Sequence, residues 1–427
     1  MAFGLNRPEL RAWALYDWAN SAFITVIVTA IFPSYYMKVA NMTDAALHPA
    51  LATERLAITT TIALALVALM APLLGAIADA APLKKKFLAF FMALGVTATA
   101  GMYMLGPNQW LLASVLFALG NICAMGSFVF YDSLLPHIAS REEVDKVSTA
   151  GYALGYVSGG VVLIAAIGLI EHPSLLGLKD AEEATRVCFV GVALWWLVFS
   201  IPLFRRVPEP AVLTTLETRG AAVMHGLSSL KDTFRALRKY KQASLFLIAF
   251  LLYNDGVGTI IKFAVIYGEE IGIDTAAMIK AILLVQFVGI PCTFLFGHLA
   301  GRLGAKTSIY IGLLVYSGVS VLGFFMTTST HFFLLAALVG LVQGGVQALS
   351  RSLFATLIPK HKSSEFFGLF AVFEKFAGIL GPLLFVAVLS VAGSSRPAIL
   401  AIIAFFVVGG LLLSRVDVAA GQRQAQE

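Results

Sequence analysis

Charged side chains occur within long apolar stretches of this chain, where an unpaired charge is energetically costly. Asn20 follows Asp17 by three residues, which places both on one face of a helix. Gln343 and Gln347 precede Arg351 by eight and four residues and share a face with it in the same way. Such groups can bind a polar solute or pair with one another. The charged residues within these stretches are Asp17, Asp132, Asp255, Lys262, Lys280, Arg351, Glu374 and Lys375.

These eight charges are divided unequally along the chain. The first half contributes Asp17 and Asp132, a net charge of −2, whereas the second half contributes two acids and four bases, a net charge of +2. A solute with one ammonium and one carboxylate group would suit such a polarised site. Ion pairs that join the halves in one conformation and break in another would explain the same charges, and both interpretations stay open.

Asp255, with Asn254 beside it, and Arg351 are the strongest candidates for contact with a solute. A guanidinium can hold a carboxylate through two parallel hydrogen bonds, which a lysine does not supply. Lys262 lies two helical turns after Asp255, so the two either pair or each face a ligand.

Asp17 and Asp132 either contact the solute or belong to a gate near one membrane surface. Glu374 and Lys375 either take part in coupling or neutralise charges on neighbouring helices. Lys280 lies about one turn inside its apolar stretch, so its ammonium group can reach the interface.

The composition requires a membrane. Of the 427 residues, 59% are hydrophobic and 13% are charged, and the mean hydropathy is +0.87. A soluble enzyme is excluded, because so few charges cannot cover a water-soluble surface. Apolar stretches of membrane-spanning length predict twelve helices. The expected spans are 12–37, 55–78, 87–106, 110–135, 147–170, 187–204, 244–267, 276–299, 307–327, 332–358, 366–392 and 397–414.

Basic residues predict the orientation. The termini and the loops on their side of the membrane hold 21 Lys and Arg residues, against five in the opposite loops. Because basic loops remain in the cytoplasm, we expect both termini there. As a separate expectation, we take the membrane to be the inner (cell) membrane of a bacterium. This distribution also explains the net charge of +6 without nucleic acid.

The chain is expected to have three parts. Residues 1–204 form a six-helix bundle, residues 205–243 a basic cytoplasmic linker with an amphipathic helix, and residues 244–427 a second six-helix bundle. An internal duplication supports the two bundles: the loop from Gly75 recurs from Gly297, and Ser133-Leu-Leu-Pro136 recurs as Thr356-Leu-Ile-Pro359, at offsets of 222 and 223.

The loop Gly75-Ala-Ile-Ala-Asp79, followed by three lysines, resembles the signature between the second and third spans of major facilitator transporters. Ala80 and Pro82 replace the basic residue and the glycine of that signature. The resemblance implies an all-α membrane protein with twelve helices in two six-helix bundles. It also implies that spans one, four, seven and ten line a central cavity, and that Asp79 belongs to a gate.

Longer strings are similar to one subfamily, the vacuole-effluxer-like transporters. They are Leu15-Tyr-Asp-Trp-Ala-Asn-Ser-Ala-Phe23, Tyr253-Asn-Asp-Gly-Val257 and Gly344-Gly-Val-Gln-Ala-Leu-Ser-Arg-Ser-Leu353. Fungal members release amino acids from the vacuole, which implies a neutral amino acid as substrate and export as the direction.

Glycines recur every four residues at Gly151, Gly155 and Gly159, which predicts close packing of the helix that carries them. Gly378, Gly381 and Pro382 predict a bend in the second half.

The sequence lacks the motifs that ATP-driven transport and metal-dependent catalysis require. The chain has no GxxxxGK[ST] motif for ATP, and its histidines lie in loops or at span ends without a metal-binding spacing. We expect no enzyme, cofactor or metal, and a monomer that meets only the bilayer, its small-molecule substrate and protons. Protonatable Asp17, Asp255 and Glu374 make proton coupling feasible. A facilitator for another polar solute or a drug, and a lipid-handling protein of the same fold, stay open as alternatives.

Overall fold

The computed structural model describes residues 4–41, 49–211 and 239–426, and every regular element in this part of the chain is a helix. The elements of the first half are α1 (Pro8–Ala22), the π-helical stretch η1 (Phe23–Ile31), α2 (Phe32–Asn41), α3 (Pro49–Ala80), α4 (Lys84–Gly101), η2 (Met102–Met104), α5 (Trp110–Ile138), α6 (Val144–Glu171), η3 (Pro173–Leu176) and α7 (Ala181–Arg206).

The second half follows the expected linker, 205–243, most of which lies outside the described residues. Its elements are α9 (Lys241–Glu270), α10 (Thr275–Leu303), α11 (Ala305–Phe324), α12 (Ser329–Leu357), η4 (Lys360–Lys362), α13 (Ser363–Phe376), α14 (Leu380–Ala392), α15 (Ser395–Ala401), α16 (Ile403–Ser414) and α17 (Val418–Gln424).

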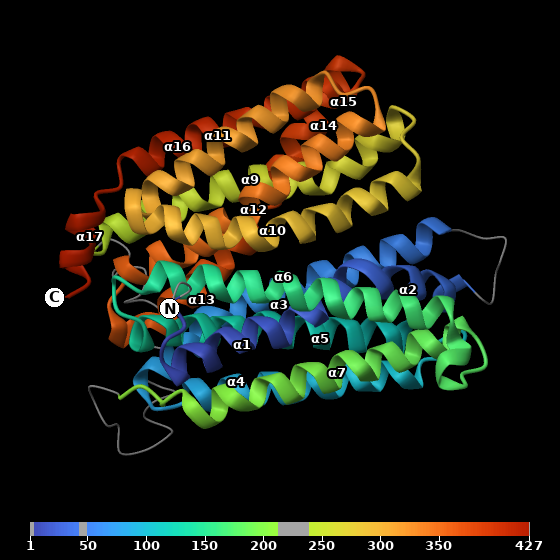
Figure 1. Ribbon diagram of the computed structural model, residues 1–427, viewed down its shortest axis with the longest axis horizontal. Coiled ribbons are helices and arrows are strands. Elements are labelled where there is room, and N and C mark those ends of the chain that lie inside the picture. Colours follow the sequence, from blue (N-terminus) through green and yellow to red (C-terminus); the bar gives the residue numbers. More distant parts are fainter. Residues whose placement is uncertain (1–3, 42–48, 212–238, 427) are drawn as a thin grey trace.

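The two halves form two groups of long helices that lie side by side (Figure 1). Helix α1 begins and α17 ends at the same end of the molecule, which we call the termini end (Figure 1). In the described residues, eleven helical segments are long and apolar enough to cross a membrane. The expected all-α membrane fold is confirmed.

The expected span 366–392 is not one continuous helix. Helix α13 ends at Phe376 and α14 begins at Leu380. Between them, Gly378 adopts φ +134°, a conformation that residues with a Cβ atom avoid. The prediction of a single helix is therefore wrong here, although the glycines and the proline indicated a bend.

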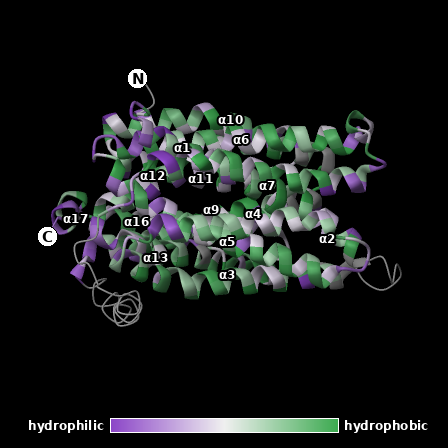
Figure 2. Ribbon diagram, turned by 90° about the horizontal axis from the view of Figure 1, so that it is seen from below, coloured by the Kyte–Doolittle hydropathy of each residue, from purple (hydrophilic) through white to green (hydrophobic). Residues whose placement is uncertain are grey.

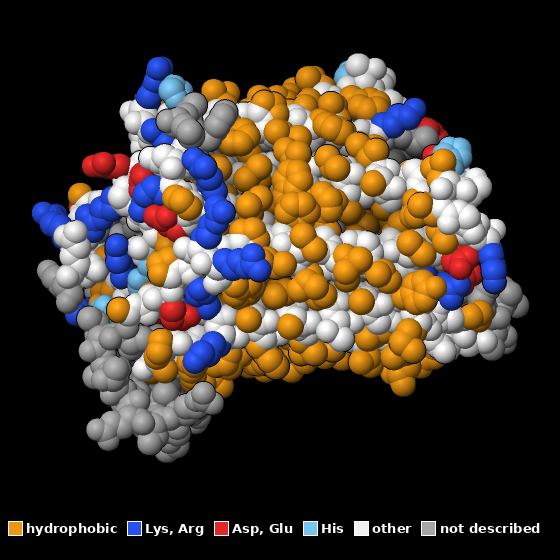
Figure 3. All heavy atoms as spheres, turned by 60° about the horizontal axis from the view of Figure 1, so that its bottom comes forward, with side chains coloured by type: hydrophobic (Ala, Val, Ile, Leu, Met, Phe, Trp, Pro, Cys, Tyr) orange, Lys and Arg blue, Asp and Glu red, His pale blue; other side chains and the backbone are white. Residues whose placement is uncertain are grey.

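The outer surface agrees with a position in a bilayer. Hydrophobic residues cover the helices along their length, and hydrophilic residues collect at the two ends (Figure 2). On the face shown in Figure 3, an apolar band separates the charged ends, and Lys and Arg side chains gather at the termini end. Large exposed side chains such as Leu69, Leu314 and Val391 belong to this apolar surface.

The glycines of α6 allow α1 to lie directly against it. A side-chain carbon at Gly151 or Gly155 would collide with Asp17 or Ser21 of α1, and one at Gly159 would collide with Thr25 of η1, which continues α1. Because the spacing of four residues matches on both helices, the packing fixes the height of Asp17 relative to α6. The predicted close packing is confirmed.

Contacts between the halves gather at the termini end. Helix α3 packs on α13, and α6 packs on α10 and α12. Gly75 of α3 approaches the backbone of Ser364 so closely that a Cβ atom would not fit. The hydroxyl of Ser148 on α6 donates a 2.7 Å hydrogen bond to the carbonyl of Ala348 on α12.

Candidate functional site

A cavity of about 670 Å³ lies between the two halves and is lined by both. From the first half, α1, η1, α5 and α6 contribute, and α9, α10, α12 and α13 contribute most of the opposite wall. Helices α1, α5, α9 and α12 are the first, fourth, seventh and tenth expected spans, as the sequence resemblance implied. The lining runs from Asp17 and Arg351 to Met326 and Phe332, which lie towards the end opposite the termini. The cavity therefore extends towards that end, whereas the halves meet at the termini end.

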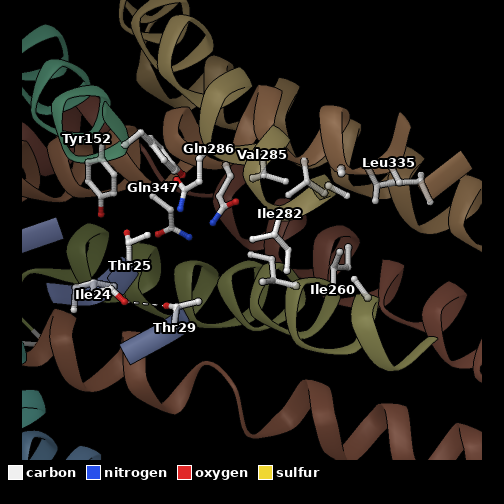
Figure 4. Close-up of a pocket in the computed structure, with 18 of the residues that line it drawn as sticks. Ile24, Thr25, Thr29, Tyr152, Ile260, Ile282, Val285, Gln286, Leu335 and Gln347 are labelled. Atoms are coloured by element: carbon white, nitrogen blue, oxygen red, sulfur yellow. Dashed lines mark hydrogen bonds between the residues drawn. The ribbon is translucent and has the colours of Figure 1, made fainter. Parts of the chain in front are cut away.

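The wall of the cavity changes from polar to apolar along its length. Gln286, Gln347, Tyr152 and Thr25 lie around one part of it, and Ile260, Ile282, Val285 and Leu335 lie around the other (Figure 4). The hydroxyl of Thr29 donates a 2.9 Å hydrogen bond to the carbonyl of Ile24 within η1 (Figure 4). Such π-helical stretches occur often at functional sites, and η1 forms part of this cavity.

Arg351 joins the halves at the termini end of the cavity. Its Nη2 lies 3.0 Å from Asp17 Oδ2 on α1, and its Nη1 lies 3.1 Å from Asp132 Oδ1 on α5. Its Nε donates to Ser148 Oγ at 3.0 Å, and Nη2 also donates to the Ser148 carbonyl at 3.0 Å. The arginine side chain is 3% exposed, and those of Asp17 and Asp132 are 7% and 14% exposed.

Aromatic rings surround the same guanidinium. Its central carbon lies 4.8 Å from the ring centroid of Trp13, 5.6 Å from that of Tyr131 and 4.4 Å from that of Tyr152. Cation–π attraction strengthens where water is excluded, so these rings stabilise the positive charge in place. We call Arg351, Asp17 and Asp132 the ion cluster. It corresponds to the interpretation in which charges of the two halves pair with each other.

Several expected site residues do line the cavity. They are Asp17, Asp132, Gln343, Gln347, Arg351 and Glu374. Asn254 does not line the cavity itself and is nearly buried. Its Oδ1 accepts a 2.6 Å hydrogen bond from Nε2 of Gln347, which does line the cavity.

Asp255 is not among the residues that line the cavity. Its side chain is fully buried and accepts 2.9 Å hydrogen bonds from the backbone nitrogens of Leu380 and Gly381. A carboxylate at this place satisfies the free N–H groups at the start of α14 and opposes the helix dipole. Asp255 thus holds the break between α13 and α14 in place.

The remaining candidates lie elsewhere. Lys262 is exposed outside the cavity lining, and its ammonium group lies beside Gly378 in the same break. Asn20 is fully buried in the first half, and its amide makes no hydrogen bond to a described residue. The side chain of Lys375 lies outside the described residues.

Asp79 lies at the seam between the halves. Its carboxylate accepts from the backbone nitrogens of Ser364 (3.1 Å) and Glu365 (2.8 Å) at the start of α13. Lys84 Nζ lies 2.7 Å from Asp79 Oδ1 and donates 2.6 Å to Ser363 Oγ. Since Asp79 and Lys84 belong to the first half and α13 to the second, this contact closes the termini end. We call it the seam contact.

Sequence reasoning missed Gln286, Tyr152 and Tyr156, which all line the cavity. The sequence could have indicated Gln286, because it is a lone amide within the apolar stretch of α10. The tyrosines lay in the glycine-rich string of α6, which indicated packing only. Among the described residues, no group of His, Cys, Asp and Glu could hold a metal ion.

Comparisons with known proteins agree with this geometry. A family model described as "Vacuole effluxer Atg22 like" matches residues 5–426. The chain is 36% identical over 406 residues to the uncharacterized MFS-type transporter YxiO of Bacillus subtilis (strain 168), covering 95% of this chain and 94% of that protein. It is 24% identical over 399 residues to autophagy-related protein 22 of Saccharomyces cerevisiae (strain S288c), covering 81% and 74%.

Solved structures share the fold at low sequence identity. The human organic anion transporter MFSD10 superposes with a TM-score of 0.70 at 14% identity, covering 95% of this chain and 99% of that one. FucP, a major facilitator transporter in its outward conformation, gives 0.68 at 11% identity, covering 98% and 100%. These likenesses show the fold.

Proposed function

We propose, since this chain belongs to the vacuole effluxer Atg22-like family of MFS-type transporters, that it moves a small zwitterion, such as a neutral amino acid, by alternating access. The observation that carries the proposal is the ion cluster. Arg351 belongs to one half and both of its carboxylate partners belong to the other, and all three line the cavity.

The proposed cycle begins with the conformation described above. The cavity admits substrate from the end opposite the termini, and the seam contact keeps the termini end closed. To open that end, α12 must move away from α1 and α5, and Arg351 must leave at least one carboxylate. Separating a buried ion pair without a replacement costs about 3–5 kcal/mol.

Substrate and protons supply the replacement charges. An ammonium group or a proton that reaches Asp132 or Asp17 compensates the carboxylate that Arg351 leaves. A ligand shifts a conformational equilibrium only by binding one conformation better than the other. A positive charge meets this condition here, because it lowers the free energy of the separated cluster more than that of the intact one.

Orientation follows from the basic residues at the termini end. In this proposal both termini face the cytoplasm of a bacterium, the described conformation is outward-facing, and the family description as an effluxer favours export.

The experiment is transport in proteoliposomes. Leucine and tyrosine, each labelled, are offered to vesicles containing the purified chain, with a labelled uncharged sugar as control, with and without a pH gradient. We expect saturable flux of at least one amino acid that responds to the gradient. Flux of the sugar but of neither amino acid would contradict the zwitterion proposal and leave the fold untouched.

A further inference from the structure

The charged residues in the cavity are mostly acidic. Among the described lining residues, Asp17, Asp132 and Glu374 carry carboxylates, and Arg351 carries the one basic side chain. Lys262 and Lys280 lie outside the lining, so Arg351 is the one base of the second half, among those whose side chains are described, that faces the cavity.

Arg351 has little capacity left for a substrate carboxylate. Its three nitrogens bond Asp17, Asp132 and Ser148, and rings of Trp13 and Tyr152 lie over the guanidinium. A carboxylate brought to it would approach two carboxylates already within hydrogen-bond distance. Like charges so close repel strongly in apolar surroundings.

Several acceptors of the residues that line the cavity receive no hydrogen bond from a described residue. Asp132 bonds Arg351 through Oδ1, and its Oδ2 bonds no residue that the structure describes. Gln286 Oε1 is buried without a partner. Gln347 donates one of its two Nε2 hydrogens to Asn254 Oδ1, and its Oε1 is a further acceptor.

A primary ammonium group matches these vacant acceptors, because it brings three N–H donors and a positive charge. A carboxylate brings acceptors alone and would leave every one of them unpaired. The apolar part of the cavity, with Ile260, Ile282 and Leu335, offers a surface for a hydrocarbon side chain.

We propose that the cavity recognises a protonated amine joined to an apolar body of leucine size, and that a substrate carboxylate contributes little to binding. The ammonium donates to Asp132, Gln286 and Gln347, and the apolar body lies on the walls of α9, α10 and α12. This inference rests on the proposed function and specifies which end of the zwitterion is bound. It extends the substrates to amines without a carboxylate, such as amino-acid amides.

The test is binding of four compounds to the purified full-length chain in detergent, measured by titration calorimetry and by thermal shift. Leucine has all three groups. Leucinamide lacks the carboxylate, 4-methylpentanoate lacks the amine, and glycinamide lacks the apolar body. We expect leucinamide to bind within about threefold of leucine or more tightly, and the other two to bind at least about tenfold more weakly than leucine, as for one lost charge-assisted hydrogen bond or a lost apolar side chain.

Two variants locate the site. Asp132→Asn should weaken leucinamide by about tenfold. Gln286→Met keeps the volume and removes an unpartnered acceptor, and should weaken leucinamide severalfold. Glu171→Gln, an exposed acid at the end of α6 outside the cavity, is the matched control and should leave the affinity unchanged. If Asp132→Asn does not fold, Gln286→Met and the four compounds on the unmodified chain still decide the question.

The outcomes separate this inference from the proposed function. Binding of leucine without binding of leucinamide overturns the amine inference and leaves amino-acid transport standing. Binding of 4-methylpentanoate as tight as that of leucine overturns it as well. If none of the four compounds binds to folded protein, both the inference and the proposed substrate class are wrong.

Discussion

Arg351 on α12 and Asp17 on α1 are 334 positions apart in the chain, yet Arg351 Nη2 lies 3.0 Å from Asp17 Oδ2. This bond crosses the boundary between the two halves at the termini end of the cavity. The same arginine also bonds Asp132, so one cation bridges two acids of the other half. Movement of the halves is therefore tied to the charge state of this cluster.

Replacing Arg351 by lysine tests whether the geometry of the guanidinium matters beyond its charge. A lysine ammonium does not have the planar fork that reaches Asp17, Asp132 and Ser148 together. We expect Arg351→Lys to lower the transport rate about tenfold or more, the equivalent of one lost charge-assisted hydrogen bond. The measurement is initial flux in proteoliposomes at matched protein content.

Lys280→Arg provides the control for this variant, because Lys280 is exposed and outside the cavity. Flux equal to that of the unmodified chain in Arg351→Lys would mean that the cluster needs only a positive charge there.

Asp79→Asn tests the seam contact. The asparagine cannot oppose the dipole of α13 with a full charge or pair with Lys84, so the closed termini end loses stability. Ser133 on α5 is buried at this seam, where its hydroxyl lies 3.0 Å from that of Ser364. We expect slower transport and faster reaction of a cysteine at Ser133 with a thiol reagent, while the amount of protein in the membrane stays unchanged.

Asp180→Asn is matched to this change, since Asp180 caps the start of α7 at the opposite end through Glu183 N (2.8 Å). If Asp79→Asn transports and reacts as Asp180→Asn does, Asp79 has no part in closing the termini end.

The glycines of α6 allow a comparison within one helix. Gly155→Ala would bring a methyl group onto Ser21 of α1, and overpacking of this kind destabilises by about 1–3 kcal/mol. Gly160→Ala meets nothing within 4 Å and should stabilise the helix by about 0.5–1 kcal/mol. Thermal unfolding of both variants in detergent gives the result. Equal midpoints would show that α1 does not lie against α6 as described.

Arg206 at the end of α7 and Ser174 in the preceding η3 test the orientation. Arg206 is exposed at the termini end, and Ser174 is exposed in η3 at the opposite end. A cysteine at Arg206 should react with a membrane-impermeant reagent only after the cells are opened, and a cysteine at Ser174 should react in intact cells. The unmodified chain, with Cys123, Cys188 and Cys292, is the background control. The reverse pattern would invert the assignment of the cytoplasmic side.

Much of the fold follows from the sequence alone, because an apolar stretch long enough to span a bilayer must satisfy its own backbone hydrogen bonds as a helix. Polar and charged side chains within the apolar stretches also identified Asp17, Asp132, Gln343, Gln347, Arg351 and Glu374 as residues near a polar site. Which of them pair depends on the relative position of the halves, which no local spacing encodes. For this reason the sequence left Arg351 with two interpretations.

Asp255 is a second residue whose role depends on tertiary structure and not on local spacing. Its acidic character and depth suggested contact with a solute, but it caps α14, whose start lies 125 positions later. That role requires both the break at Gly378 and the packing of α14 against α9, which are tertiary facts. Gln286 was missed because no second polar residue lies three or four positions away from it in α10, so the spacing gave no indication of a site.

Alternating access itself is tested most directly by distances across the two ends of the cavity. Spin labels at Ser174 and Thr327 report on the end opposite the termini, and labels at Lys86 and Lys360 report on the termini end; all four residues are exposed. With saturating leucine, we predict that the Ser174–Thr327 distance shortens while the Lys86–Lys360 distance lengthens in the same sample. Distances that stay unchanged at both ends, or that change in the same direction, would contradict the account.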